Sequence, residues 1–152
     1  MKREKYLGEL KSGHERVEEI FHHLRNVIEE EHKPDIGAAM STLGELQDIL
    51  VSHVKDEDEY FYPALRQRAV ELGQEALIPS IDLFAESMHG ISEKVGGFFA
   101  RYKTEEDIQG DIEGFKVKLA EIIEIVDERI KSEEGSLFYI YRAYFPEEGC
   151  EA

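Results

Sequence analysis

Apolar residues recur along the chain at alternating steps of three and four, which is the spacing of one face of an α-helix. Such stretches predict helices at about residues 2–32, 34–63, 80–102 and 105–144. Pro34 ends the first stretch, and Pro63 kinks or ends the second, so residues 64–73 are expected to form a connection. Amphipathic helices joined by short connections predict an all-α fold, an up-down-up-down antiparallel four-helix bundle. The length of 152 residues suits one such domain, spanning residues 1–152.

The predicted inner face of each helix is apolar apart from a few polar interruptions. In the second helix this face continues through Leu50 to Tyr60, and in the fourth it runs through Leu137 and Ile140. The interruptions are His14, His53, Glu57, Arg129 and Glu133, and His89 borders the apolar face of the third helix.

These interruptions fall at similar distances from the turns expected near residues 33, 72 and 107, so they are predicted to lie in one layer of the bundle. Burying an unpaired imidazole or carboxylate costs several kcal/mol, so the members of such a layer must satisfy one another or bind something. A metal ion meets this need, because it accepts lone pairs from neutral His and ionised Glu together. His53 and Glu57, four residues apart, share a helix face and can reach the same ion. Glu134, by contrast, is expected to be solvated.

The same residues lie in segments that resemble the hemerythrin-like (HHE cation-binding) family. The segment that begins at His53, HVKDEDEYFYP, looks like the HxxxE…(F/Y)P signature of that family. The first-helix ligand is matched by His14, in GHERVEEIF, and the third-helix ligand by His89, in ESMHGISEKV. The fourth-helix HxxxE segment is matched from Arg129 by RIKSEEGSLFY. HxxxE alone is a weak motif, but the ordered set over about residues 6–142 is fairly specific.

The resemblance implies a site for two non-haem irons with His ligands and two bridging carboxylates. The metal ligands that it implies are His14, His53, Glu57, His89, Glu93 and Glu133. Glu57 and Glu133 would be the bridging carboxylates, and His14 and His53 would bind the first iron. This first position keeps all of the ligands that the family pattern expects.

The second iron position departs from the family pattern. His89 and Glu93 would belong to it, and Glu93 stands where some members have His and others Glu. The fourth-helix residue is Arg129, whose guanidinium stays protonated and cannot ligate a metal. We therefore expect one occupied position, or an altered pair of irons.

By the same resemblance, the chain is expected to be a non-haem iron protein. Its small ligand would be O₂, NO or peroxide, or it would sense iron or redox status. The alternative is a metal-free or zinc-bound helical interaction module, in which Arg129 bridges Glu57 and Glu133 in a buried charge network. The sequence does not favour an enzyme acting on an organic substrate, because it shows no nucleophile–base pair and no Gly-rich phosphate loop.

Charge and cysteine content narrow the class of partner and the compartment. The net charge of −16 argues against nucleic acid, which is bound by clustered Lys and Arg. The one cysteine, Cys150, excludes an intramolecular disulfide, and the first residues lack the apolar stretch of a signal peptide, so we expect a cytoplasmic protein. No apolar run approaches the roughly 18 residues of a membrane span, so no membrane association is expected.

Overall fold

The computed structural model describes residues 3–29 and 35–145, and in these residues it contains helices and turns but no strand. The elements, in chain order, are α1 (Arg3–Ile28), α2 (Ile36–Asp56), the π-helical segment η1 (Glu57–Phe61), α3 (Tyr62–Glu71), the 3-10 turn η2 (Glu75–Leu77), α4 (Ile78–Arg101), α5 (Glu105–Gln109), α6 (Ile112–Ser132), the π-helical segment η3 (Glu133–Leu137) and α7 (Phe138–Tyr144). The predicted all-α class is confirmed for this part of the chain. The expectations that concern Pro34 and Cys150 lie outside the described residues.

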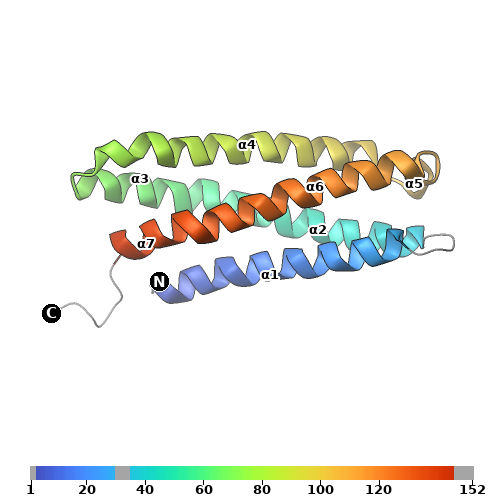
Figure 1. The fold of residues 1–152 in the computed structure, drawn as a ribbon, viewed down its shortest axis with the longest axis horizontal. Coiled ribbons are helices and arrows are strands. Elements are labelled where there is room, and N and C mark those ends of the chain that lie inside the picture. Colours follow the sequence, from blue (N-terminus) through green and yellow to red (C-terminus); the bar gives the residue numbers. More distant parts are fainter. Residues whose placement is uncertain (1–2, 30–34, 146–152) are drawn as a thin grey trace.

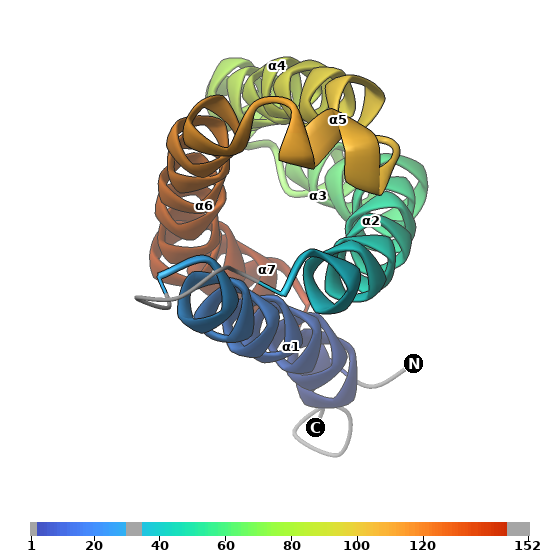
Figure 2. The ribbon, with the colours of Figure 1, turned by 90° about the vertical axis from the view of Figure 1, so that its right-hand side faces the viewer.

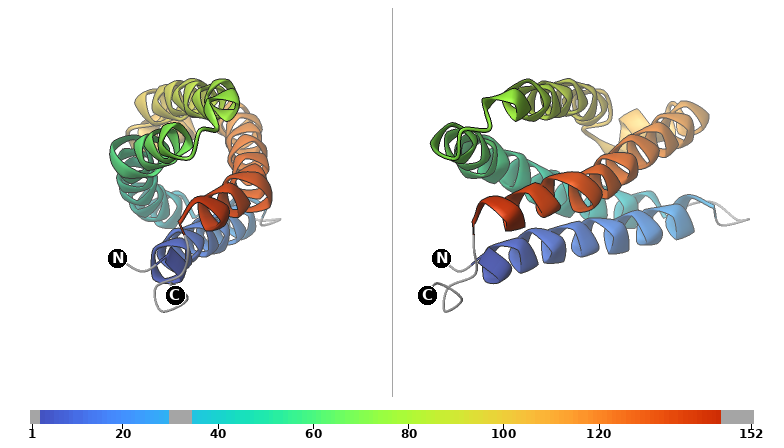
Figure 3. Two further views of the ribbon diagram at one scale, coloured as in Figure 1. Left: turned by 90° about the vertical axis from the view of Figure 1, so that its left-hand side faces the viewer. Right: turned by 60° about the vertical axis from the view of Figure 1, so that its left-hand side comes forward.

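The long helices lie side by side around a common interior (Figure 1). Seen along the long axis, α1, α2 with α3, α4, and α6 with α7 form the walls of a ring (Figure 2), and two further views show the same arrangement (Figure 3). Helix α1 packs mainly on α2, while α4 packs on α3 and on α6. None of the described helices combines the length and the apolar character that crossing a membrane requires.

Side-chain caps fix where two of these helices begin. The Asp35 carboxylate accepts a hydrogen bond from the backbone N–H of Ala38 at the start of α2. The Asp111 carboxylate accepts one from the N–H of Gly114 at the start of α6. Capping by Asp111 competes with continuation of the preceding helix. The stretch predicted as one helix from residue 105 onward is therefore interrupted between α5 and α6.

The second long helix does not end at Pro63, and residues 64–71 are helical rather than a connection. The turn before Pro63 is π-helical, because the backbone N–H of Tyr62 donates to the carbonyl of Glu57, five residues earlier. In a regular α-helix the ring of Pro63 would press on the carbonyl of Glu59. The wider π-helical turn leaves room for the ring, so the helix continues through Pro63.

Each π-helical segment adds one residue to its turn and so rotates the residues that follow it. Tyr60, predicted to face the core, is 45% exposed, and its neighbour Phe61 is fully buried instead. In the fourth stretch, Ile140 is only partly buried, while Phe138 and Tyr141 are buried. The predicted inner positions of Tyr60 and Ile140 were therefore wrong, because the prediction assumed a constant 3.6-residue period, whereas Leu137 is buried as predicted.

The buried apolar residues form two clusters, one toward each end of the bundle. The first includes Val17, Leu46, Leu50, Phe98, Phe115, Leu119 and Val126. The second includes Leu7, Leu10, Phe61, Leu65, Ile81, Leu137 and Phe138. Between Leu10 and Val17 of α1 stands the buried His14. A polar layer at the level of His14 thus separates the two halves of the core.

Candidate metal centre

Four titratable side chains converge in this polar layer. They are His14 from α1, His53 from α2, Glu57 at the start of η1 and Glu133 at the start of η3, and one ligand atom of each lies within 4.8 Å of the others. The exposed fraction of His14 is 2% and that of Glu57 and of Glu133 is 1%, whereas His53 is partly exposed. The structure therefore brings together four of the six side chains that the family resemblance suggests as ligands.

Local helix geometry aims these side chains at one another. His53 and Glu57 lie one turn apart, and their Nε2 and Oε1 atoms are 2.7 Å apart. Glu57 and Glu133 each open a π-helical segment, and the carbonyl of Glu133 accepts from the N–H of Phe138, as that of Glu57 accepts from Tyr62. Single π-helical turns are rare and occur often at functional sites.

Glu134 orients the ring of His14. The Nδ1 atom of His14 lies 2.7 Å from Oε2 of Glu134, and a carboxylate there accepts the Nδ1–H. In the neutral ring this leaves Nε2 with its lone pair facing the cluster, which is the arrangement seen for metal-ligating histidines. Glu134, expected to be solvated, instead holds a His in a defined orientation.

The cluster has more acceptor atoms than donor protons. His53 Nε2 lies 3.0 Å from His14 Nε2 and 2.7 Å from Glu57 Oε1, and one ring proton can serve only one of these two acceptors at a time. Oε1 of Glu133 is buried with no hydrogen-bond partner at all. Buried lone pairs without protons are unfavourable. A cation among the four ligand atoms would satisfy them, so the residues present fit a metal ion.

Burial is the main influence on the titration of the carboxyl groups. It raises the pKa of Glu57, and it raises the pKa of Glu133 to about 7, with hydrogen bonding between the two carboxyls adding to the rise of Glu133. For the imidazoles, burial lowers the pKa of His53. Burial acts in the same sense on His14, but the pull of Glu133 and Glu134 outweighs it and the pKa of His14 is raised. The metal-free cluster therefore retains protons that a bound metal would displace.

A second polar unit, Arg129 with Tyr62, adjoins the carboxylates. Arg129 is 7% exposed, and its Nη2 donates to the hydroxyl of Tyr62, which in turn donates to Oε2 of Glu57 at 3.4 Å. The Arg129 Nε atom lies 3.8 Å from Oε1 of Glu133, which is too long for a hydrogen bond. The guanidinium thus contacts one carboxylate directly and the other through Tyr62.

Helix α4 contributes no side chain to the cluster. His89 lies on the exposed side of α4, where 67% of its side chain is accessible, and its Nε2 is 3.4 Å from Asp58 Oδ1. Glu93, one turn further, is also exposed. Both residues were expected to belong to the second metal position. The structure places them outside the group formed by the other four ligand candidates.

The sequence analysis assigned no site role to Tyr62 or Glu134. Tyr62 precedes Pro63, and a regular helical period would not turn it toward Glu57; the π-helical segment does so. Glu134 follows Glu133 directly, so it was assigned to the wet face of the helix. In the structure Phe138, four residues after Glu134, stacks on the ring of His14, but the spacing of the sequence alone does not reveal this contact.

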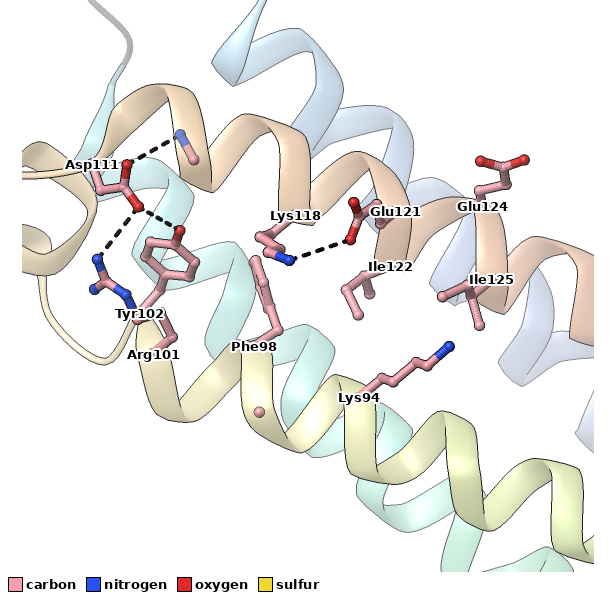
Figure 4. A pocket seen from close by; sticks show the side chains of 12 residues that line it. Lys94, Phe98, Arg101, Tyr102, Asp111, Lys118, Glu121, Ile122, Glu124 and Ile125 are labelled. Carbon is pink, nitrogen blue, oxygen red and sulfur yellow. Dashed lines mark hydrogen bonds and ion pairs between the residues drawn. The ribbon is translucent and has the colours of Figure 1, made fainter.

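A separate hollow of about 750 Å³ lies between α4 and α6, toward the α5 end (Figure 4). Basic and acidic side chains alternate along it, with Lys118 paired to Glu121 and Arg101 paired to Asp111. None of the four converging residues lines this hollow. It is therefore distinct from the candidate metal centre.

Comparison with known proteins agrees with this geometry. The sequence-family model of the hemerythrin HHE cation-binding domain matches residues 7–141 of this chain. No curated protein and no solved structure matches the chain in the corresponding comparisons. The family match spans most of the chain and includes all four residues of the cluster. This protein therefore belongs to the hemerythrin HHE cation-binding domain family.

Proposed function

We propose that this protein binds one non-haem iron ion through His14, His53, Glu57 and Glu133. The iron serves to bind a small ligand such as O₂, NO or peroxide, or to report iron or redox status. The observation that carries the proposal is the convergence of these four ligand atoms within 4.8 Å, in a buried layer where Oε1 of Glu133 has no hydrogen-bond partner.

The proposal includes the architecture around the site. The alternating direction of successive long helices in Figure 1 supports an up-down-up-down antiparallel four-helix bundle. In such a bundle, side chains on facing helices can share one ion in the interior. The presence of a single cysteine supports a cytoplasmic location.

The donor set favours iron. Two imidazole nitrogens with carboxylate oxygens are a ligand combination used by non-haem iron(II), and the cluster contains no thiolate, a ligand typical of structural zinc. When bound, iron supplies an open coordination position and a change of oxidation state. The protein residues orient the ligands: Glu134 holds the Nδ1–H of His14, and Tyr62 donates to Glu57.

Arg129 supports one ion rather than two. Its guanidinium lies beside Glu133, where it would repel a metal cation. Two positive unit charges 4 Å apart repel by about 4 kcal/mol at an effective dielectric constant near 20. A second metal dication on this side of the carboxylates carries two positive charges, so its repulsion by Arg129 would be about twice as large. His89 and Glu93, which would complete a second ligand set, are exposed on α4. On this proposal, the guanidinium of Arg129 takes the place of a second metal ion.

Metal content tests the proposal. Protein loaded with Fe(II) without oxygen and then desalted should retain about one iron per chain by elemental analysis. The double variant His14→Ala/His53→Ala should retain none. The matched control is His22→Ala/His23→Ala, which removes two exposed imidazoles from α1, the helix of His14, and should retain the wild-type amount. Full iron content in the first double variant would place the site elsewhere.

One observation favours a second candidate, a metal-free or zinc-bound interaction module. Arg129, Tyr62 and Glu57 already form a hydrogen-bonded chain without any metal. If the polar layer serves only to form this network, purified wild-type protein will contain zinc or no transition metal even after Fe(II) loading. In that case its melting temperature will also be unchanged by Fe(II).

A further inference from the structure

A hollow of about 320 Å³ opens between α4 and α6 and reaches Arg129. Its exposed lining residues are Leu83, Ser87, Glu128 and Ser132, and its partly buried ones are Phe84, Ile91 and Ile125. Arg129 is the one buried residue among those that line it. The hollow therefore runs from a mixed rim, past apolar walls, to a buried cation.

Arg129 has donor capacity left over at this inner end. Its Nε–H is buried without a hydrogen-bond partner, and Oε1 of Glu133 is 3.8 Å away. The guanidinium carbon lies 5.1 Å from the ring centroid of Phe84, which itself lines the hollow. A buried N–H without a hydrogen-bond acceptor favours an acceptor supplied from outside, although the same guanidinium also donates to Tyr62.

We propose that this hollow binds a small organic carboxylate, with its two oxygens at Arg129 and its carbon chain against the apolar walls. A carboxylate matches the planar, forked donors of a guanidinium better than a spherical anion does. Phe84, Ile91 and Ile125 provide the apolar contact, and the volume lies in the range of small-molecule pockets. The site goes beyond metal binding and does not require the metal.

Two glutamates near the hollow leave the site open to an anion. Glu128 is exposed at the rim, where solvent and salt screen its charge. Glu133 also faces His14, whose Nε2 is 3.7 Å from its Oε2. Neither glutamate forms a hydrogen bond with Arg129. The ion pair between Glu133 and the guanidinium is 3.8 Å long, so the Nε–H has no acceptor of its own.

Titration calorimetry on metal-free protein tests the proposal with acetate, butyrate and hexanoate as probes. Affinity should rise by about fourfold for each methylene that enters the apolar part of the hollow. Butylammonium, with the same chain and the opposite charge, should not bind. No detectable binding of any carboxylate at millimolar concentration, or equal binding of butylammonium, would overturn the proposal.

Two variants locate the binding site. Arg129→Met keeps most of the side-chain volume and should abolish carboxylate binding. Ser87→Trp leaves Arg129 in place and should block the hollow from its exposed rim, so it tests the site even if the Arg129 variant fails to fold. Ser80→Trp, at an exposed position of the same helix outside the hollow, should bind like the wild type. Unchanged binding in folded Arg129→Met or in Ser87→Trp would refute the assignment. Because all of these titrations are made without metal, they are independent of whether iron binds.

Discussion

Glu57 and Glu133 occupy equivalent positions, because each is the first residue of a five-residue π-helical segment in its own long helix. The two carboxyls meet in the polar layer, and the chain beyond each one is rotated relative to the preceding α-helix. This pairing connects the register of the core to the placement of the site.

The rotation after Glu57 predicts very different roles for two adjacent aromatic residues. Phe61→Ala should lower the free energy of unfolding by about 3–5 kcal/mol, because it empties a fully buried position. Tyr60→Ala should cost about 1 kcal/mol or less, since the ring is 45% exposed. Urea unfolding of both variants makes the comparison. Similar losses for the two would mean that the π-helical segment is absent in solution.

Under the proposed function, Arg129 limits the number of metal ions that the layer accepts to one. Arg129→His removes the internal cation and adds an imidazole, so the iron content of Fe(II)-loaded protein should rise above one per chain, toward two. Arg129→Met removes the cation without adding a ligand, and its iron content should stay near one. Elemental analysis with protein quantitation measures both. Two irons at full occupancy in the unmodified protein would contradict the role given to Arg129.

Glu134 should control metal affinity without touching the metal. Its carboxylate accepts the Nδ1–H of His14, and loss of such an outer partner lowers metal affinity by about 10- to 100-fold. Glu134→Ala should show this loss in competition with a chelator, and Glu134→Gln, which retains an acceptor oxygen, should show less. Glu124→Ala removes an exposed carboxylate from the same long helix and serves as the control. Equal affinities for all the variants would remove Glu134 from the site.

The stability of the metal-free protein should fall as the pH rises through the range set by Glu133. Its pKa is about 7 in the folded chain and 4.5 in the unfolded chain, so the folded state binds more protons between these values. Because stability changes with the difference in bound protons, it declines with rising pH across this window, by about 3 kcal/mol at most. The raised pKa of His14 adds to the decline above its ordinary value of 6.5, and the lowered pKa of His53 opposes it.

Urea unfolding between about pH 5 and pH 8 measures this slope. Glu133→Gln cannot titrate at that position and should show a flatter profile. Bound Fe(II) should reverse the trend, because it requires the ionised carboxylate. A wild-type profile that rises with pH in the absence of metal would show that Glu133 ionises normally in the folded protein.

Much of the fold could be predicted from the sequence because helical periodicity is strong in every long segment. The level of the polar layer followed from counting residues to the turns, and His14, His53, Glu57 and Glu133 do converge. What failed was the assumption of a uniform helix. A single extra residue in a turn leaves no compositional mark, so the burial of Phe61 and the contact of Tyr62 with Glu57 could not be found from the spacing.

The positions of His89 and Glu93 show a different limit. Glu93 was assigned from the family pattern alone. His89 was assigned from that pattern and from the border of an apolar stripe, where a small rotation of the helix decides between interior and solvent. Met88 and Val95 point inward on α4, and this orientation carries His89 and Glu93 to the outside. Whether a side chain at the edge of an apolar stripe is buried depends on tertiary packing. The local spacing of apolar residues does not determine it.

The polar layer at His14 also divides the interior into two hydrophobic halves that share few buried apolar neighbours. Each half can then behave as its own cooperative unit, and the four converging side chains become the coupling between them. Binding or loss of a metal ion among these side chains would change that coupling. The end built from α3 and α7 would open more often when no metal is bound, so metal occupancy would appear as a difference in local unfolding. Amide hydrogen exchange in those two helices would read it directly.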